Sequence, residues 1–121
     1  MITVNGTIIA PAPPEPIRTH TVPDSVPNTG EHTSGAVYSN GFGPYHNTGN
    51  VDQTLTVAAT HEVNINITGL TLMVDGIDLG STTAILAPAK SAYAMVSSTL
   101  APLPDGVPSE TFSFELDDTW S

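Results

Sequence analysis

The chain has 121 residues, enough for one ordinary domain with an appendage or for one larger all-β domain. Its 10 glycines and 11 prolines lack collagen-like spacing and argue against a helix bundle. The 12 acidic and 2 basic side chains give a formal net charge of -10, so we expect neither nucleic acid nor an anionic membrane as a main partner. The absence of cysteine excludes disulfides and thiol chemistry. No apolar run approaches the roughly 20 residues of a membrane span, and no signal peptide is recognisable.

The first half of the chain has the composition of an extended arm. Residues 1–50 hold 7 of the 11 prolines and 6 of the 10 glycines. The strand-like piece here is residues 1–9, whose apolar side chains lie around an expected Asn5-Gly6 turn. Residues 10–16, rich in proline, favour an extended polyproline conformation. Because this half has no periodic apolar face, it cannot build a core of its own, and we expect it to be disordered or ordered against another surface.

Aromatic residues mark candidate contact points. Three of the six Phe and Tyr residues, Tyr38, Phe42 and Tyr45, lie close together near the end of the arm, separated by glycines. Solvated linkers seldom carry such a cluster, so we interpret these residues as anchors that dock on the folded half or on a neighbouring chain. An ordinary loop packed on its own domain is the alternative interpretation. Trp120 is expected to pack under its own domain or into a neighbour, and it completes the predicted set of partner contacts.

The second half of the chain has the pattern of short strands. Apolar and polar residues alternate along most of it, and Asp75-Gly76 is a strong hairpin signal. The segments with strand character are residues 54–60, 63–68, 70–74, 77–79, 83–86, 92–99 and 112–116. About seven strands, with turn signals about every 8–12 residues, are typical of an antiparallel sandwich.

These patterns predict an all-β fold with two parts. A small antiparallel immunoglobulin-like β-sandwich covers residues 51–121, and an extended, largely irregular N-terminal arm covers residues 1–50. About fifteen to eighteen inward side chains would form the core of the sandwich. Conformational entropy cancels most of the free energy gained by their burial, so the sandwich is marginal alone and gains from packing against partners.

Three short motifs stand out in the second half: LMVDG at residues 72–76, LAPAKSA at 86–92 and FSFELD at 112–117. Together they resemble immunoglobulin-like modules of the CARDB and related bacterial adhesion type. Such modules show a V-D-G hairpin, an L-A-P-G turn and a final strand that ends in Asp; here Ala89 stands in place of the Gly. The resemblance covers residues 51–118 at most, supports the sandwich and implies no catalytic residues.

The titratable side chains form no recognisable catalytic or metal-binding motif. His20, His32 and His46 are spaced 12 and 14 residues apart, whereas structural zinc sites prefer ligand pairs close in sequence. Asp75 and Asp78 flank a hairpin tip but supply too few oxygens for calcium. A G-x-S-x-G elbow, a P-loop and a G-x-G-x-x-G motif are all missing. We therefore expect no enzymatic activity, no cofactor and no metal.

The organisation of the chain, a compact β domain with a long extended arm, is similar to that of phage capsid decoration proteins. This likeness implies a non-enzymatic virion protein, assembled in the host cytoplasm, that binds the shell through its arm and stabilises it. The expected partners are the major capsid protein or other virion proteins and further copies of the chain, for which a trimer is one arrangement. The alternative is an adhesion or carbohydrate-binding immunoglobulin-like module of a cell-surface protein, which would need an export signal.

Overall fold

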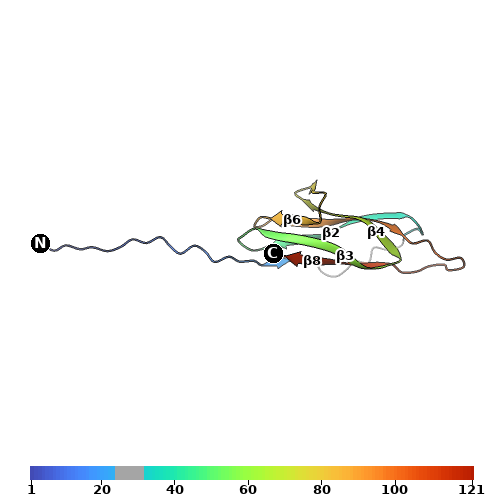
Figure 1. Cartoon of the computed structure of the whole chain (residues 1–121), viewed down its shortest axis with the longest axis horizontal. Helices are drawn as coiled ribbons and strands as arrows, with labels where there is room; N and C mark the ends of the chain where they lie inside the picture. Colours follow the sequence, from blue (N-terminus) through green and yellow to red (C-terminus); the bar gives the residue numbers. More distant parts are fainter. Residues whose placement is uncertain (24–31) are drawn as a thin grey trace.

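A computed structural model describes residues 1–23 and 32–121 and shows an all-β protein. Over these residues the chain forms two antiparallel sheets packed face to face, as the strand pattern predicts (Figure 1). The strands are β1 (His20–Thr21), β2 (Val37–Asn47), β3 (Gln53–Val63), β4 (Ile65–Val74), β5 (Ile77–Asp78), β6 (Thr83–Leu86), β7 (Ser91–Leu100) and β8 (Ser113–Trp120). A helix that could cross a membrane does not occur among the described residues.

The two sheets differ in size. The larger sheet has five strands in the order β1-β2-β7-β4-β5, and the smaller has three in the order β6-β3-β8. The chain passes between the sheets after β5, where the Leu72 amide donates to the Ser81 carbonyl and the Val57 amide to the Thr82 carbonyl, at 2.8 and 3.0 Å. β8 pairs with β3 on one side and is the edge strand of the smaller sheet in the part of the chain that the structure describes.

β2 enters the sandwich from the half of the chain that the sequence pattern assigned to the arm. Residues 37–47 pair with β7 in the middle of the larger sheet, so the irregular part of the chain does not extend to residue 50. The alternation along β2 is hidden in the sequence because polar Asn40 interrupts it and because the register shifts between Phe42 and Tyr45. Pro44 lies within this shift, where its missing N–H removes no ladder hydrogen bond.

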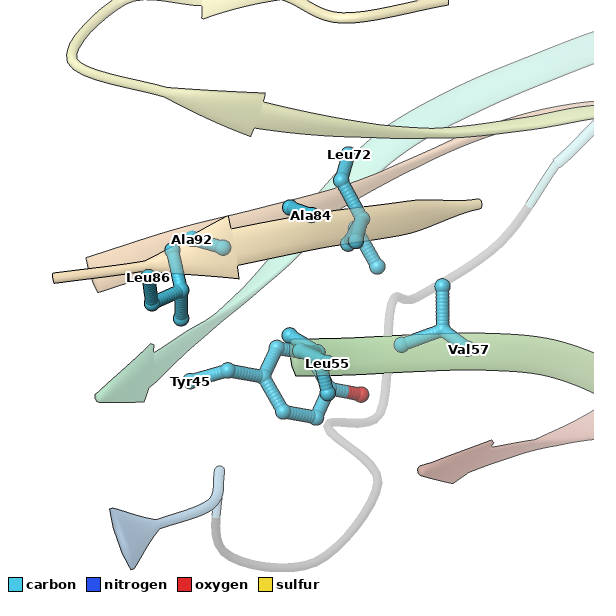
Figure 2. Packing of buried hydrophobic residues seen from close by; sticks show 8 residues of the cluster. Tyr45, Leu55, Val57, Leu72, Ala84, Leu86 and Ala92 are labelled. Carbon is cyan, nitrogen blue, oxygen red and sulfur yellow. The ribbon is translucent and has the colours of Figure 1, made fainter. Parts of the chain in front are cut away.

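The core lies between the sheets and follows strict alternation along β7, where every second residue from Ala92 to Leu100 is buried. Tyr45 of β2 points between the sheets toward Leu55 of β3, beside Leu72 and Leu86 (Figure 2). One buried cluster consists of Tyr45, Leu55, Val57, Leu72, Ala84, Leu86, Ala92 and Ala94. A second cluster, at the other end, consists of Tyr38, Ile65, Val96, Leu100 and Phe114.

The stability of the sandwich is expected to depend on pH in the alkaline range because Tyr45 is buried. Its burial raises the pKa of the phenol above the ordinary value of 10.0, and the negative charge of Asp118 acts in the same direction. Because the folded-state pKa exceeds the unfolded one, the protonated ring contributes its full stability below pH 10, and this contribution falls as the pH rises beyond it. Urea unfolding at a series of pH values is expected to show this loss, and Tyr45→Phe to reduce it. An alkaline loss that is the same in Tyr45→Phe would contradict the assignment.

Candidate interaction site: the N-terminal arm and its anchor

The segment that precedes the sandwich is fixed to it over residues 15–21, which we call the anchor. His20 and Thr21 form β1, which pairs with Asn47 and His46 at the end of β2. One step further along the chain, the Thr48 amide donates to the Thr19 carbonyl at 3.1 Å. The anchor therefore continues the larger sheet at its edge and lies along the loop between β2 and β3.

Asn50 extends this pairing beyond β1. Its backbone amide donates to the Ile17 carbonyl at 3.0 Å. Its side chain takes the place of a neighbouring strand, because Oδ1 accepts the Ile17 amide at 2.7 Å and Nδ2 donates to the Glu15 carbonyl at 3.0 Å. These bonds join only backbone groups of the anchor, so they fix its path without depending on its side chains.

A buried amide pair connects the anchor to the interior of the sandwich. Asn47 and Gln53 are 0% and 2% exposed. The Gln53 Nε2 donates to the Thr19 carbonyl at 2.7 Å and to Asn47 Oδ1 at 2.6 Å. The Asn47 Nδ2 in turn donates to the carbonyls of Val51 and Leu86, both at 2.8 Å. The position of the anchor is thus coupled to groups that cannot lose their partners without a cost in free energy.

Two aromatic rings stack on each other at the point where the arm leaves the sandwich. The rings of His20 and Trp120 are parallel, with their centroids 4.2 Å apart and an interplanar angle of 6°. The Trp120 Nε1 donates to Asp118 Oδ2 at 2.7 Å, which holds the indole in place. His20 belongs to the five-stranded sheet and Trp120 to the three-stranded one, so the stack joins the two sheets.

Gly49 is the position at which the anchor can be released by one methyl group. A Cβ at this residue would overlap the backbone carbonyl of Ile17, and backbone cannot move aside as a flexible side chain can. Gly49→Ala is expected to detach residues 15–19 and to raise hydrogen exchange at the Ile17 and Asn50 amides by about a hundredfold, because their bonds are lost. Gly6→Ala is the matched control, since a Cβ there meets nothing within 4 Å. Unchanged exchange in Gly49→Ala would show that the anchor does not depend on this contact.

Residues 1–14, which we call the free arm, extend away from the sandwich (Figure 1). The expected Asn5-Gly6 hairpin is not formed: residues 1–19 contain no strand or turn. Along an extended chain Ile2, Val4 and Ile8 share one face, and the intervening polar residues occupy the other. These three apolar side chains are 89%, 88% and 101% exposed, so within the described residues nothing covers them.

The structure places the predicted contact residues against their own chain. Tyr38 and Tyr45 are 8% and 3% exposed and lie in the two buried clusters, so neither is available to a partner. Phe42 is half-buried, with its ring edge-on to Phe114 at a centroid distance of 5.7 Å. The alternative interpretation, aromatic residues packed on their own domain, is the one that applies to these three. Trp120 is half-buried at the anchor.

The remaining polar groups form no comparable arrangement. Over residues 1–23 and 32–121, no three His, Asp or Glu side chains lie close enough together to hold a metal ion. The ion pairs of Lys90 with Asp75 and of His61 with Glu115, both at 3.1 Å, lie on the surface. A hollow of about 430 Å³ lies at the end of the sandwich remote from the anchor, lined by His32, Ser34, Asn64, Leu103, Glu110 and Phe112 among others.

The residues that hold the anchor were not predicted. Asn47, Gly49 and Asn50 lie in the predicted arm and Gln53 lies just before the first predicted strand, and no motif connects them to residues 15–21. No protein-family model, characterised protein or solved structure matches this chain. The likeness to immunoglobulin-like modules therefore holds for the architecture, two packed antiparallel sheets, and no family is identified.

Proposed function

We propose that this protein is a non-enzymatic structural protein of a virus particle. It decorates or completes the shell, holds to its neighbours there through the N-terminal arm and stabilises the assembly. The sandwich sits outward as a knob. The partners are the major capsid protein or other virion proteins, together with further copies of this chain, and assembly takes place in the host cytoplasm.

The observation that carries this proposal is the contrast between the anchor and the free arm. Backbone hydrogen bonds and the buried amide pair give residues 15–21 a fixed path, whereas the apolar side chains of residues 1–14 are in solvent. An arm that bound nothing outside its own chain would not need a fixed attachment such as residues 15–21. An apolar segment held in solvent gains free energy once another surface covers it, by about 1.5–3 kcal/mol for each large side chain.

The distribution of charge supports contact through the arm rather than through the body. Residues 1–14 contain no charged side chain, so all 12 acidic and both basic residues lie in residues 15–121. Two such bodies repel one another at low ionic strength, and the uncharged arm is the part of the chain that can approach another acidic surface without this cost.

The test is incorporation into the particles of the virus that encodes the chain. Residues 1–14 are all exposed and form no hydrogen bond with the described remainder of the chain, so a chain without them is expected to keep the folded sandwich. Mass spectrometry of purified particles is expected to find the full chain and to find the truncated chain reduced by about tenfold or more. Ile85→Ser, at a side chain 70% exposed on β6, serves as a control that removes an exposed apolar group elsewhere. Equal incorporation of the truncated chain, or absence of the full chain from particles, would contradict the proposal.

A further inference from the structure

We propose that residues 1–9 of one copy bind as an added β-strand along β8 of a second copy. This inference rests on the proposed function, since both assign the arm to a protein neighbour, but it names that neighbour and the edge that it offers.

The free arm has the pattern of a strand that lacks a sheet. Over residues 2–8, its apolar face carries Ile2, Val4 and Ile8 with Gly6 between them, and its other face carries Thr3, Asn5 and Thr7; Met1 and Ile9, at the two ends, share the parity of this polar face. Such alternation is what a strand at the border of a core requires, with apolar side chains inward and polar ones outward. β-Branched residues dominate the segment, which also favours a strand. In strand addition, main-chain hydrogen bonds supply affinity and alternate side chains enter the partner.

The spacer between this segment and the anchor directs it away from its own sandwich. Residues 10–14 contain three prolines, which favour a stiff polyproline conformation. At about 3.1 Å per residue, these five residues place residues 1–9 about 15 Å from the anchor. A stiff spacer that leaves the body cannot fold back within its own length, so the sheet that receives residues 1–9 belongs to another molecule.

Among residues 1–23 and 32–121, no strand pairs with the outer edge of β8, whose length matches that of residues 1–9. Thr54 and Ser121 exchange both backbone hydrogen bonds, at 2.7 and 2.9 Å. From this pair the antiparallel register turns the backbone groups of every second residue, at positions 119, 117 and 115, toward β3. The N–H and C=O groups of the intervening residues point to the outer edge, where no other strand of the described sheet pairs with them. These residues are Phe114, Leu116, Asp118 and Trp120.

The side chains along this edge fit an amphipathic strand. The four residues whose backbone groups are free are also those whose side chains point inward. Leu116 and Trp120 are only half-buried against the core, so an apolar neighbour would cover the remainder. Four inward positions on β8 face four on the arm, at residues 2, 4, 6 and 8.

Charge favours the arm over a second β8 as the strand that pairs with this edge. The edge carries Glu115, Asp117 and Asp118, so a second β8 would bring like charges together. Residues 1–9 contain no acidic side chain and avoid this repulsion. The acidic edge thereby excludes edge-to-edge pairing of β8 with itself and leaves the arm of a neighbour as the complementary strand.

The chain contains no cysteine, so single cysteines can test the pairing without background. Chains that carry Thr3→Cys, Asn5→Cys or Thr7→Cys are each mixed with a chain that carries Asp117→Cys and are oxidised. Neighbouring outward residues on paired strands are close enough for a disulfide. We expect a mixed dimer from at least one of these pairs at about ten times the yield obtained with Thr83→Cys, an exposed position on β6 at the opposite edge of the same sheet. Equal yields from Asp117→Cys and Thr83→Cys would overturn the inference.

A second pair of variants tests the apolar face directly. In the chain that carries Asn5→Cys, Val4→Asn places an uncharged amide on the apolar face and Thr3→Asn places the same amide on the polar face, without adding charge beside Glu115. Both positions are exposed, so the sandwich folds in either variant. Val4→Asn is expected to lower the cross-linked yield about tenfold, and Thr3→Asn to lower it much less. Equal loss in the two variants would contradict strand pairing through the apolar face.

The two proposals fail in different ways. A chain that shows no cross-link to β8 and remains monomeric in sedimentation, yet needs its arm to enter particles, would overturn pairing between copies and leave the proposed function standing. A chain that pairs through β8 but enters particles equally well without residues 1–14 would support the pairing and contradict attachment to the particle through the arm.

Discussion

Leu72→Ala is expected to lower the free energy of unfolding by about 3–5 kcal/mol. Leu72 lies in β4 and is 0% exposed, in the cluster that also contains Leu55 and Leu86. Removal of its side chain takes apolar surface out of the core and leaves a cavity that the two sheets cannot fully close, because their backbones are fixed by ladder hydrogen bonds. The loss is a large share of the stability of a domain this small, so a substantial unfolded population is expected near body temperature.

Urea unfolding followed by circular dichroism measures this effect. Leu79→Ala is the matched control: it removes the same atoms from a side chain 44% exposed, close to β4 in space. The Leu79 amide donates to the Leu72 carbonyl, and this backbone bond is kept in both variants. We expect the control to lose about 1 kcal/mol or less. Losses of similar size in the two variants would mean that Leu72 is not in the core.

Asn47→Ala is expected to cost about 2–4 kcal/mol and to loosen the anchor at the same time. The Asn47 side chain donates two hydrogen bonds, to the Val51 and Leu86 carbonyls, and accepts two, from the Gly49 amide and Gln53 Nε2. Alanine leaves all four partners without this side chain in a buried site, where water does not replace it freely. Gln53 also holds the Thr19 carbonyl, so its displacement weakens the attachment of the arm.

Two readouts separate these effects. Urea unfolding gives the loss in free energy, and hydrogen exchange at the Thr48 amide, which donates to the Thr19 carbonyl, reports the anchor. Asn66→Ala on the exposed face of β4 is the matched control and is expected to change both by little. A stable Asn47→Ala protein with a protected Thr48 amide would show that the buried amide pair does not hold the arm.

The alternation of apolar and polar residues predicted most of the second half of the fold. β7 is the clearest case, since every second residue from Ala92 is buried as the pattern requires. The Asp75-Gly76 signal predicted the hairpin between β4 and β5, and both residues adopt positive φ angles there, 53° and 76°. Local chemistry decides such features, and a single sequence is sufficient to find them.

The alternation of apolar and polar residues did not predict β2. Its inward residues include Tyr38, Tyr45 and Asn47, but the shift in register at Pro44 changes the phase of the pattern midway. Asn47 also reads as a surface residue, although it is 0% exposed, because its partners come from residues 51, 53 and 86, which only the fold brings near. Tyr38 and Tyr45, which were predicted as partner contacts, pack instead into the core of their own chain.

The anchor was beyond prediction for a related reason. Its bonds join side-chain amides to backbone N–H and C=O groups that are 33 to 35 residues away in sequence. Such contacts leave no periodicity or motif, because almost any residue can supply a backbone carbonyl. The exposure of Ile2, Val4 and Ile8 likewise follows from the path of the chain and not from the identity of these residues. The same alternation of apolar and polar residues would suit a strand that pairs within its own chain.

Hydrogen exchange on the full chain as a dilute monomer distinguishes the anchor from the free arm. Residues 15–21 are held to the sandwich by hydrogen bonds, whereas residues 1–14 are exposed and form no hydrogen bond with the rest of the described chain. We predict that the Ile17, Thr48 and Asn50 amides are protected, whereas the amides of residues 2–9 exchange at the rate of an unstructured peptide. Protection of residues 2–9 in the monomer would show that the arm is already covered by its own chain and would contradict the account.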